Sequence, residues 1–133
     1  MKPIYLLLSC LLIVNSSCHK DDELNLRVNN VSDNAIYVSW TRDNSDASLN
    51  HIVNPTYYSQ IKKVEAHSVQ EDYYGAPSEA FFKYIDTLTV FVFDAQVVET
   101  TPWDTIKAKC LVLKRYDLSL DDLNKLTWII TYP

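Results

Sequence analysis

The chain has 133 residues, 47% of them hydrophobic, and a formal net charge of −5 at pH 7. This acidic balance, without a basic cluster, argues against nucleic-acid binding and against electrostatic attraction to an anionic lipid surface. Residues 24–133 are enough for one domain with a single core that needs no metal or disulfide.

The chain begins with one basic residue, Lys2, followed by an apolar run over residues 4–14. A helix of that length covers roughly 16 Å, whereas the hydrocarbon core of a bilayer is about 30 Å thick. The run is therefore too short to span a membrane, and residues 1–17 are predicted to be a signal peptide. The alternative is a buried helix, which would show a polar face, but only Ser9 and Cys10 interrupt the run.

The stretch "NSSC" ends this segment and resembles the lipobox of bacterial lipoproteins, with Ser16 and Ser17 at the small-residue positions. The resemblance implies that Cys18 becomes the first residue and carries acyl chains, which makes the membrane its partner. Two chains are needed for stable attachment. Cys10 also follows a suitable local pattern, but cutting there would leave the oily "LLIV" in the mature chain.

The following "CHKDDE" resembles the surface-export tag of Bacteroidetes lipoproteins, with Lys20, Asp21 and Asp22 at the matching positions. The resemblance implies that the domain faces outward from the outer membrane. The same residues also fit a solvated tether, since charge runs usually mark exposed segments. Residues 19–23 extend at most about 18 Å, so a domain that begins at residue 24 would lie close to the lipid surface.

Alternating apolar residues over 24–41, around an Asn/Ser/Asp-rich turn, predict a β-hairpin. Residues 42–55 are predicted to form a loop, followed by a turn near Tyr57 and an extended segment over 61–69. Pro77 can open a short helix that ends at Tyr84. The run "TLTVFVFDA" predicts a central strand, because it is apolar on both faces.

The last third of the chain alternates between predicted helices and strands. "TPWDTIKAK" predicts a helix capped by Thr101, with Pro102 in its first position. "CLVLKRY" predicts a strand, "SLDDLNKL" a helix capped by Ser119, and "TWIITY" a final strand. The short connection between these last two strands favours an antiparallel return. The predicted fold is mainly β within the α+β class: an antiparallel sheet or a two-sheet sandwich with two or three short helices.

The C-terminal pattern "RYDLS.DDL…W…YP" is similar to that of a group of small Bacteroidetes lipoproteins, over about the last quarter of the chain. This resemblance supports the location. It implies no activity, cofactor or catalytic residue.

Catalytic and metal-binding signatures are sparse. His19, His51 and His67 lie in no GxSxG or HExxH pattern, and the single glycine, Gly75, offers little close backbone approach. His51 and His67 lack the paired spacing of metal ligands. We therefore predict no enzyme, no catalytic residue, no metal and no cofactor. A small hydrolase whose triad assembles in space is the remaining enzymatic alternative.

Cys110 would be the one cysteine left after processing and acylation, so no intramolecular disulfide is expected. Because it lies in the strand-like "CLVL", we predict a buried small hydrophobe and not a nucleophile.

Tyrosines combine a rigid apolar face with a polar tip, which suits binding of sugars or proteins. Four of them form adjacent pairs in predicted loops or edges and are candidate ligand-facing residues: Tyr57, Tyr58, Tyr73 and Tyr74. Packing around the rim of the core is the alternative. Trp40 and Trp128 are predicted core residues.

"DTL" and "DTI" resemble the O-glycosylation acceptor of exported Bacteroidetes proteins, which makes Thr87 and Thr105 candidate sites. Asp104 and Thr105 also fit the start of a helix without modification.

These features together predict a lipid-anchored outer-membrane protein that acts as a non-enzymatic binding module for a protein or a glycan. The alternatives are an accessory subunit of an envelope assembly and, third, the small hydrolase.

Overall fold

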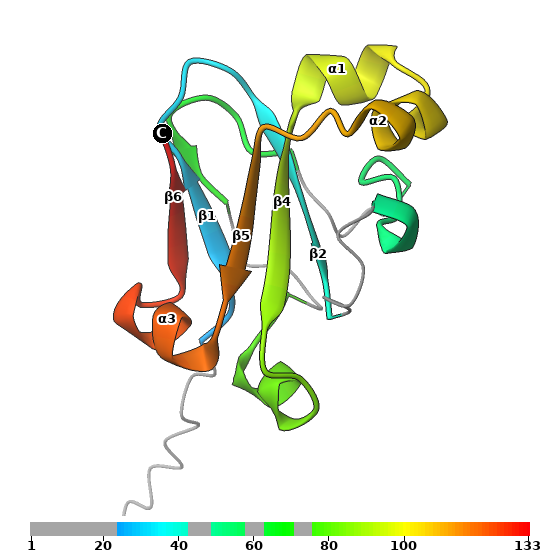
Figure 1. Cartoon of the computed structure of the whole chain (residues 1–133). Helices are drawn as coiled ribbons and strands as arrows, with labels where there is room; N and C mark the ends of the chain where they lie inside the picture. The colour runs from blue at the N-terminus through cyan, green and yellow to red at the C-terminus, as the bar shows by residue number, and fades with distance from the viewer. Residues whose placement is uncertain (1–23, 43–48, 58–62, 71–75) are drawn as a thin grey trace, which may run out of the picture.

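The computed structural model describes residues 24–42, 49–57, 63–70 and 76–133 and contains two three-stranded sheets that face each other (Figure 1). The first sheet has the order β3-β1-β6, formed by Ser68–Val69, Arg27–Asn30 and Ile129–Tyr132. The second has the order β2-β4-β5, formed by Ile36–Thr41, Leu88–Asp94 and Lys114–Leu118. The predicted β-rich α+β fold with two sheets is confirmed.

Short helices lie at both ends of this sandwich and over the outer face of the sheet that contains β4 (Figure 1). The α-helices are α1 (Ala95–Thr100), α2 (Trp103–Lys109) and α3 (Leu120–Lys125). The 3-10 helices are η1 (Leu49–His51) and η2 (Glu79–Lys83). No helix within the described ranges is long and apolar enough to cross a bilayer.

The predicted hairpin between β1 and β2 is wrong, because these consecutive strands belong to different sheets. β1 pairs antiparallel with β3 and parallel with β6, whereas β2 pairs with β4. The predicted antiparallel return of the last two strands is wrong for the same reason: β5 and β6 lie in opposite sheets, with α3 between them. Alternation marks a strand but leaves its partner open, and these partners are distant in sequence.

The main core lies between the sheets. Alternate side chains of β1, β2, β4 and β6 point into it, among them Val28, Val38, Val90 and Ile130. Trp128 is buried there as predicted, and Trp40 packs against it half-buried.

A second cluster lies on the other face of β4, where Phe91 and Phe93 pack with Leu49, Val98 and Ile106 beneath η1, α1 and α2. β4 is thus covered on both faces, which explains its apolar run from Val90 to Phe93.

The region around α1 and α2 differs from its prediction in two ways. α1 was not predicted, and Thr101 ends it as the C-cap instead of opening α2. The N-cap of α2 is Pro102, without a side-chain hydrogen bond. Asp94 provides the helix-starting signal instead: its Oδ1 atom accepts from the backbone N–H of Val97 at 2.9 Å.

Cys110 is exposed, so its predicted burial in a strand is wrong. It follows α2 in the left-handed conformation, with a φ of 50°. Its N–H donates to the Lys107 carbonyl, and the Leu111 N–H donates to the Ile106 carbonyl. These bonds form a Schellman motif, which ends the helix and turns the Cys110 position away from the core.

α3 begins as predicted. The Ser119 hydroxyl accepts from the Asp122 N–H at 3.1 Å, and the Asp122 carboxylate accepts from the Ser119 N–H at 2.9 Å. This reciprocal capping box satisfies two backbone donors of the first turn.

Candidate functional site

The sandwich has two chemically different ends. At one end, which we call the α3 end, the described chain begins: Asn25 bridges to Ser78, and the Leu26 N–H donates to the Pro77 carbonyl just before η2. The opposite end, which we call the α1 end, carries α1, α2 and the β1–β2 turn (Figure 1). β4 connects the two, running from η2 to α1.

Three polar side chains meet at the α1 end, and we call them the Glu99 cluster. The Lys63 ammonium lies 3.1 Å from Glu99 Oε1. The Tyr37 hydroxyl donates to the same oxygen at 3.1 Å. Tyr37 comes from β2 and Glu99 from α1, so the cluster links a sheet edge to a helix.

A hollow of about 140 Å³ lies beside this cluster. Its wall consists of Lys63 and Glu99 together with Asn34, Ala35, Asp94, Ala95 and Gln96. Asp94 caps α1 through its side chain and so fixes the direction in which this helix presents Gln96 and Glu99. The hollow is therefore built by the connection from β4 into α1, and it is mainly polar.

The environment of the Glu99 cluster favours a charged Lys63, a charged Glu99 and a neutral Tyr37. The hydrogen bond to Glu99 raises the pKa of Lys63, and the hydrogen bonds from Lys63 and Tyr37 lower the pKa of Glu99. Burial, and then the hydrogen bond to Glu99, raises the pKa of Tyr37. All three pKa values move away from neutrality, whereas a general acid or base works best with a pKa near the operating pH. The cluster suits binding better than proton transfer.

His67 and Asp33 form a pair outside the hollow, with His67 Nε2 2.9 Å from Asp33 Oδ1. Both side chains are well exposed. The nearby hydroxyls of Ser32 and Ser68 donate to Asn30 Oδ1 and to the Glu65 carbonyl. This arrangement lacks the enclosed nucleophile of a triad. Within the described residues there is also no group of three His, Cys, Asp or Glu side chains that could hold a metal.

A larger, more open hollow of about 330 Å³ lies at the α3 end, between η2 and α3. It is lined by Glu79, Ala80, Phe82, Lys83 and Leu120. Phe82 packs edge-on against Trp128 with ring centroids 6.3 Å apart, so the floor of this hollow belongs to the core.

Among the site residues predicted from the sequence, the three that the structure describes, Tyr57, Thr87 and Thr105, line neither hollow. Cys18, Lys20, Asp21, Asp22, Tyr58, Tyr73 and Tyr74 lie outside the described residues. Tyr57 is 77% exposed, in a turn after η1. Thr87 lies just before β4 and Thr105 lies within α2, both half-buried.

The residues of the Glu99 cluster were not predicted. Tyr37 and Glu99 are 62 positions apart, and no sequence motif joins them to Lys63. The only local signal was the outward position of Tyr37 in an alternating strand.

No protein-family model, curated protein or solved structure matches this chain.

Proposed function

We propose that this protein is a lipoprotein, anchored through acyl chains on Cys18 to the outer membrane and facing outward, that binds a protein or glycan without catalysing a reaction. The observation that carries the binding role is the position of the Glu99 cluster and its hollow at the end of the sandwich opposite Leu24. A chain tethered just before Leu24 would present this hollow away from the lipid.

The anchor and the outward orientation rest on the sequence "NSSCHKDDE", whose cysteine and charged residues resemble a lipobox and an export tag. The resemblance of the C-terminal segment to small Bacteroidetes lipoproteins supports the same location. The tether of residues 19–23 is short, with a reach of about 18 Å.

The chemistry of the hollow favours a polar ligand. Lys63 supplies a donor and Glu99 an acceptor, while Asn34 and Gln96 add amide side chains that can do both. Sugar hydroxyls and peptide groups both match this set. Because the charges are held by their mutual hydrogen bonds, the ligand would meet a preorganised surface.

An accessory subunit of an envelope assembly is the second candidate. Leu111 and Leu113, between α2 and β5, are exposed and lie on neither strand nor helix. Such residues are suited to a stable protein contact.

Photo-cross-linking in intact cells tests the binding role. A benzoylphenylalanine in place of exposed Gln96, at the rim of the hollow, should capture a discrete product. The same group in place of exposed Glu79, at the α3 end, is the matched control and should not capture that product. Capture of one protein in stoichiometric yield would favour the accessory subunit, whereas retention of the purified chain on a glycan array would favour a glycan receptor. Equal products from both positions, with no glycan retained, would contradict a binding role for this hollow.

A further inference from the structure

Large apolar side chains are exposed together at the α3 end. Leu24 is 56% exposed, Tyr84 is 85% exposed and Leu126 is 43% exposed. Tyr84 is the C-cap of η2 and Leu126 the C-cap of α3, while Leu24 directly precedes the bridge from Asn25 to Ser78. Three separate segments thus bring apolar groups to the end of the sandwich that also carries the hollow lined by Phe82 and Leu120.

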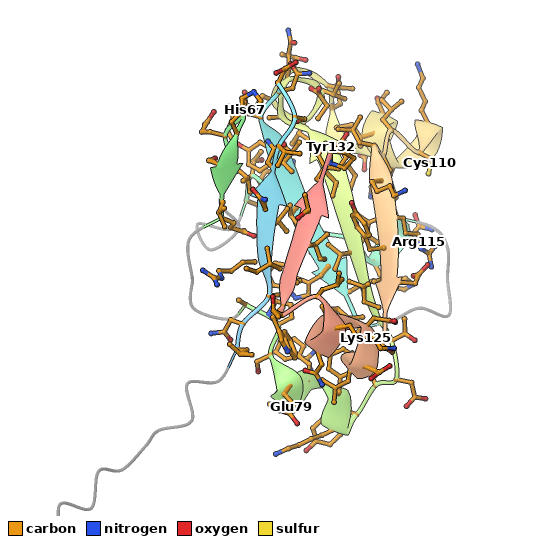
Figure 2. All side chains as sticks on the ribbon, turned by 90° about the vertical axis from the view of Figure 1, so that its left-hand side faces the viewer. His67, Glu79, Cys110, Arg115, Lys125 and Tyr132 are labelled. Atoms are coloured by element: carbon orange, nitrogen blue, oxygen red, sulfur yellow. The ribbon has the colours of Figure 1, made fainter. Side chains whose placement is uncertain are left out.

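Polar groups at this end are of the kind found at lipid headgroups. Tyr84 has an apolar ring and a polar tip, which favours the membrane–water interface. Lys83 and Lys125 end η2 and α3, and their long stems can cover apolar surface while the ammonium stays in water. In Figure 2, Glu79 and Lys125 lie at the α3 end, whereas Cys110 and His67 lie towards the α1 end.

The short linker between Cys18 and the domain limits which end of the domain can face the bilayer. Residues 19–23 separate Cys18 from Leu24 and reach at most about 18 Å. The headgroup layer of one leaflet takes up about 5–8 Å of this reach, so Leu24 can lie at most about 10–13 Å beyond the lipid surface. A chain attached at Cys18 would therefore hold the α3 end against the bilayer and the α1 end away from it.

We propose that the α3 end, through Leu24, Tyr84 and Leu126, is a membrane-docking surface for the lipid headgroup layer of the bilayer in which Cys18 is anchored. This inference rests on the proposed lipid anchor and adds an orientation to it. The contact needs no anionic lipid, because an anionic surface would gain no net attraction from the mixed charges at this end: Glu79, Asp86, Asp121 and Asp122 with Arg42, Lys83 and Lys125. The contact is apolar and fixes the axis of the sandwich relative to the membrane.

Depth-dependent quenching tests the contact on the full, lipid-modified chain in phosphatidylcholine vesicles. One sample carries an environment-sensitive fluorophore on the natural, exposed Cys110. The other carries it at position 79 through Glu79→Cys in a Cys110→Ser background. Nitroxide-labelled lipids should quench the fluorophore at position 79 at least twofold more than the one at Cys110. Combining Tyr84→Asp with Leu126→Glu should reduce the quenching at position 79 to the Cys110 level, whereas Leu111→Glu, an exposed leucine near α2, should leave it unchanged.

Vesicle flotation separates this inference from the anchor on which it rests. If the chain floats with the vesicles and both positions are quenched equally, or the double variant changes nothing, the docking surface is wrong and the anchor stands. If the unsubstituted chain does not float, both are overturned. Replacing half the phosphatidylcholine with an anionic lipid should not increase quenching at position 79, and an increase would contradict the apolar character of the contact.

Discussion

The Nδ2 atom of Asn30 donates to the backbone carbonyl of Glu65, 3.1 Å away, although 35 positions separate the two residues. The same amide donates to the carbonyls of Val64 and Asn34, and its Oδ1 atom accepts from Ser32. Asn30 is fully buried, at the end of β1. This one side chain therefore holds the β1–β2 turn against the segment that carries Lys63, and it helps to place Lys63 beside Glu99.

Asn30→Ala should lower the free energy of unfolding by about 2–4 kcal/mol, because it removes the hydrogen bonds of a fully buried amide, each of which contributes about 0.5–1.5 kcal/mol. Urea denaturation followed by circular dichroism would measure the change. Asn29→Ala is the matched control on the same strand, where the side chain points to the opposite face and is half-buried. It should cost clearly less, and equal losses for both variants would contradict the role of Asn30.

Thr127→Gly should stabilise the protein by about 0.5–1 kcal/mol. Thr127 occupies the left-handed conformation after α3, with a φ of 52°, and its N–H donates to the Asn124 carbonyl. The Trp128 N–H donates to the Leu123 carbonyl, which completes a Schellman motif in which glycine is the usual residue. Thermal unfolding would measure the gain. Thr131→Gly is the control: Thr131 lies in extended β6, so this change should destabilise the protein. A fall in melting temperature for Thr127→Gly would show that the left-handed conformation of Thr127 does not destabilise the fold.

Asp117→Asn should weaken the dependence of stability on acidic pH. The hydrogen bonds from Arg115 and then from Thr89 lower the pKa of Asp117. A carboxyl group whose pKa is lower in the folded state stabilises the fold above its unfolded pKa, about 3.9, and this contribution is lost as the pH falls through the folded value. The side chain is 49% exposed and screened by water, so the contribution is only about 0.5 kcal/mol.

The measurement is the difference between the free energies of unfolding at pH 6 and pH 3. It should be smaller for Asp117→Asn than for the unsubstituted chain, while the Thr89 hydroxyl can still donate to the new amide oxygen. An unchanged difference would show that Asp117 does not contribute to the acid response.

Local signals in the sequence are sufficient to predict β4 and α3. β4 is apolar on both faces because it is covered on both, and Ser119 and Asp122 cap α3 as a pair of neighbouring residues. Strand pairing was not predictable in this way. β1 pairs in parallel with residues 129–132, at the far end of the chain, and the alternation of apolar residues within a strand does not encode a partner so distant in sequence.

The apolar run "CLVL" predicts a strand with Cys110 buried in it. This prediction is wrong because the helix α2 extends to Lys109 and ends at Cys110, a left-handed residue that is not glycine. The Glu99 cluster could not be predicted from the sequence, because its residues are far apart along the chain. Its three members come from β2, the segment before Val64 and α1, and only the folded chain brings them together.

Cys18→Ala should release the protein from the membrane fraction, because it removes the predicted acyl attachment site and residues 19–23 are highly charged. Sedimentation of cell lysates followed by detection of the chain would measure this. Cys110→Ala is the matched control, since it removes the exposed cysteine of the domain and leaves the anchor in place. Unchanged sedimentation of the Cys18→Ala variant would refute the lipid anchor.

Asp21→Ala combined with Asp22→Ala should make the domain resistant to protease added outside whole cells. The hypothesis of an export tag requires these two carboxylates close to the acylated cysteine. Without them, the chain should stay anchored on the inner face of the outer membrane. Asp86→Ala combined with Asp104→Ala removes the same charge from two exposed positions within the domain and should leave the chain accessible to protease. Membrane sedimentation should be the same for both double variants, which separates export from anchoring. If protease cuts both equally, residues 21 and 22 act only as a solvated tether.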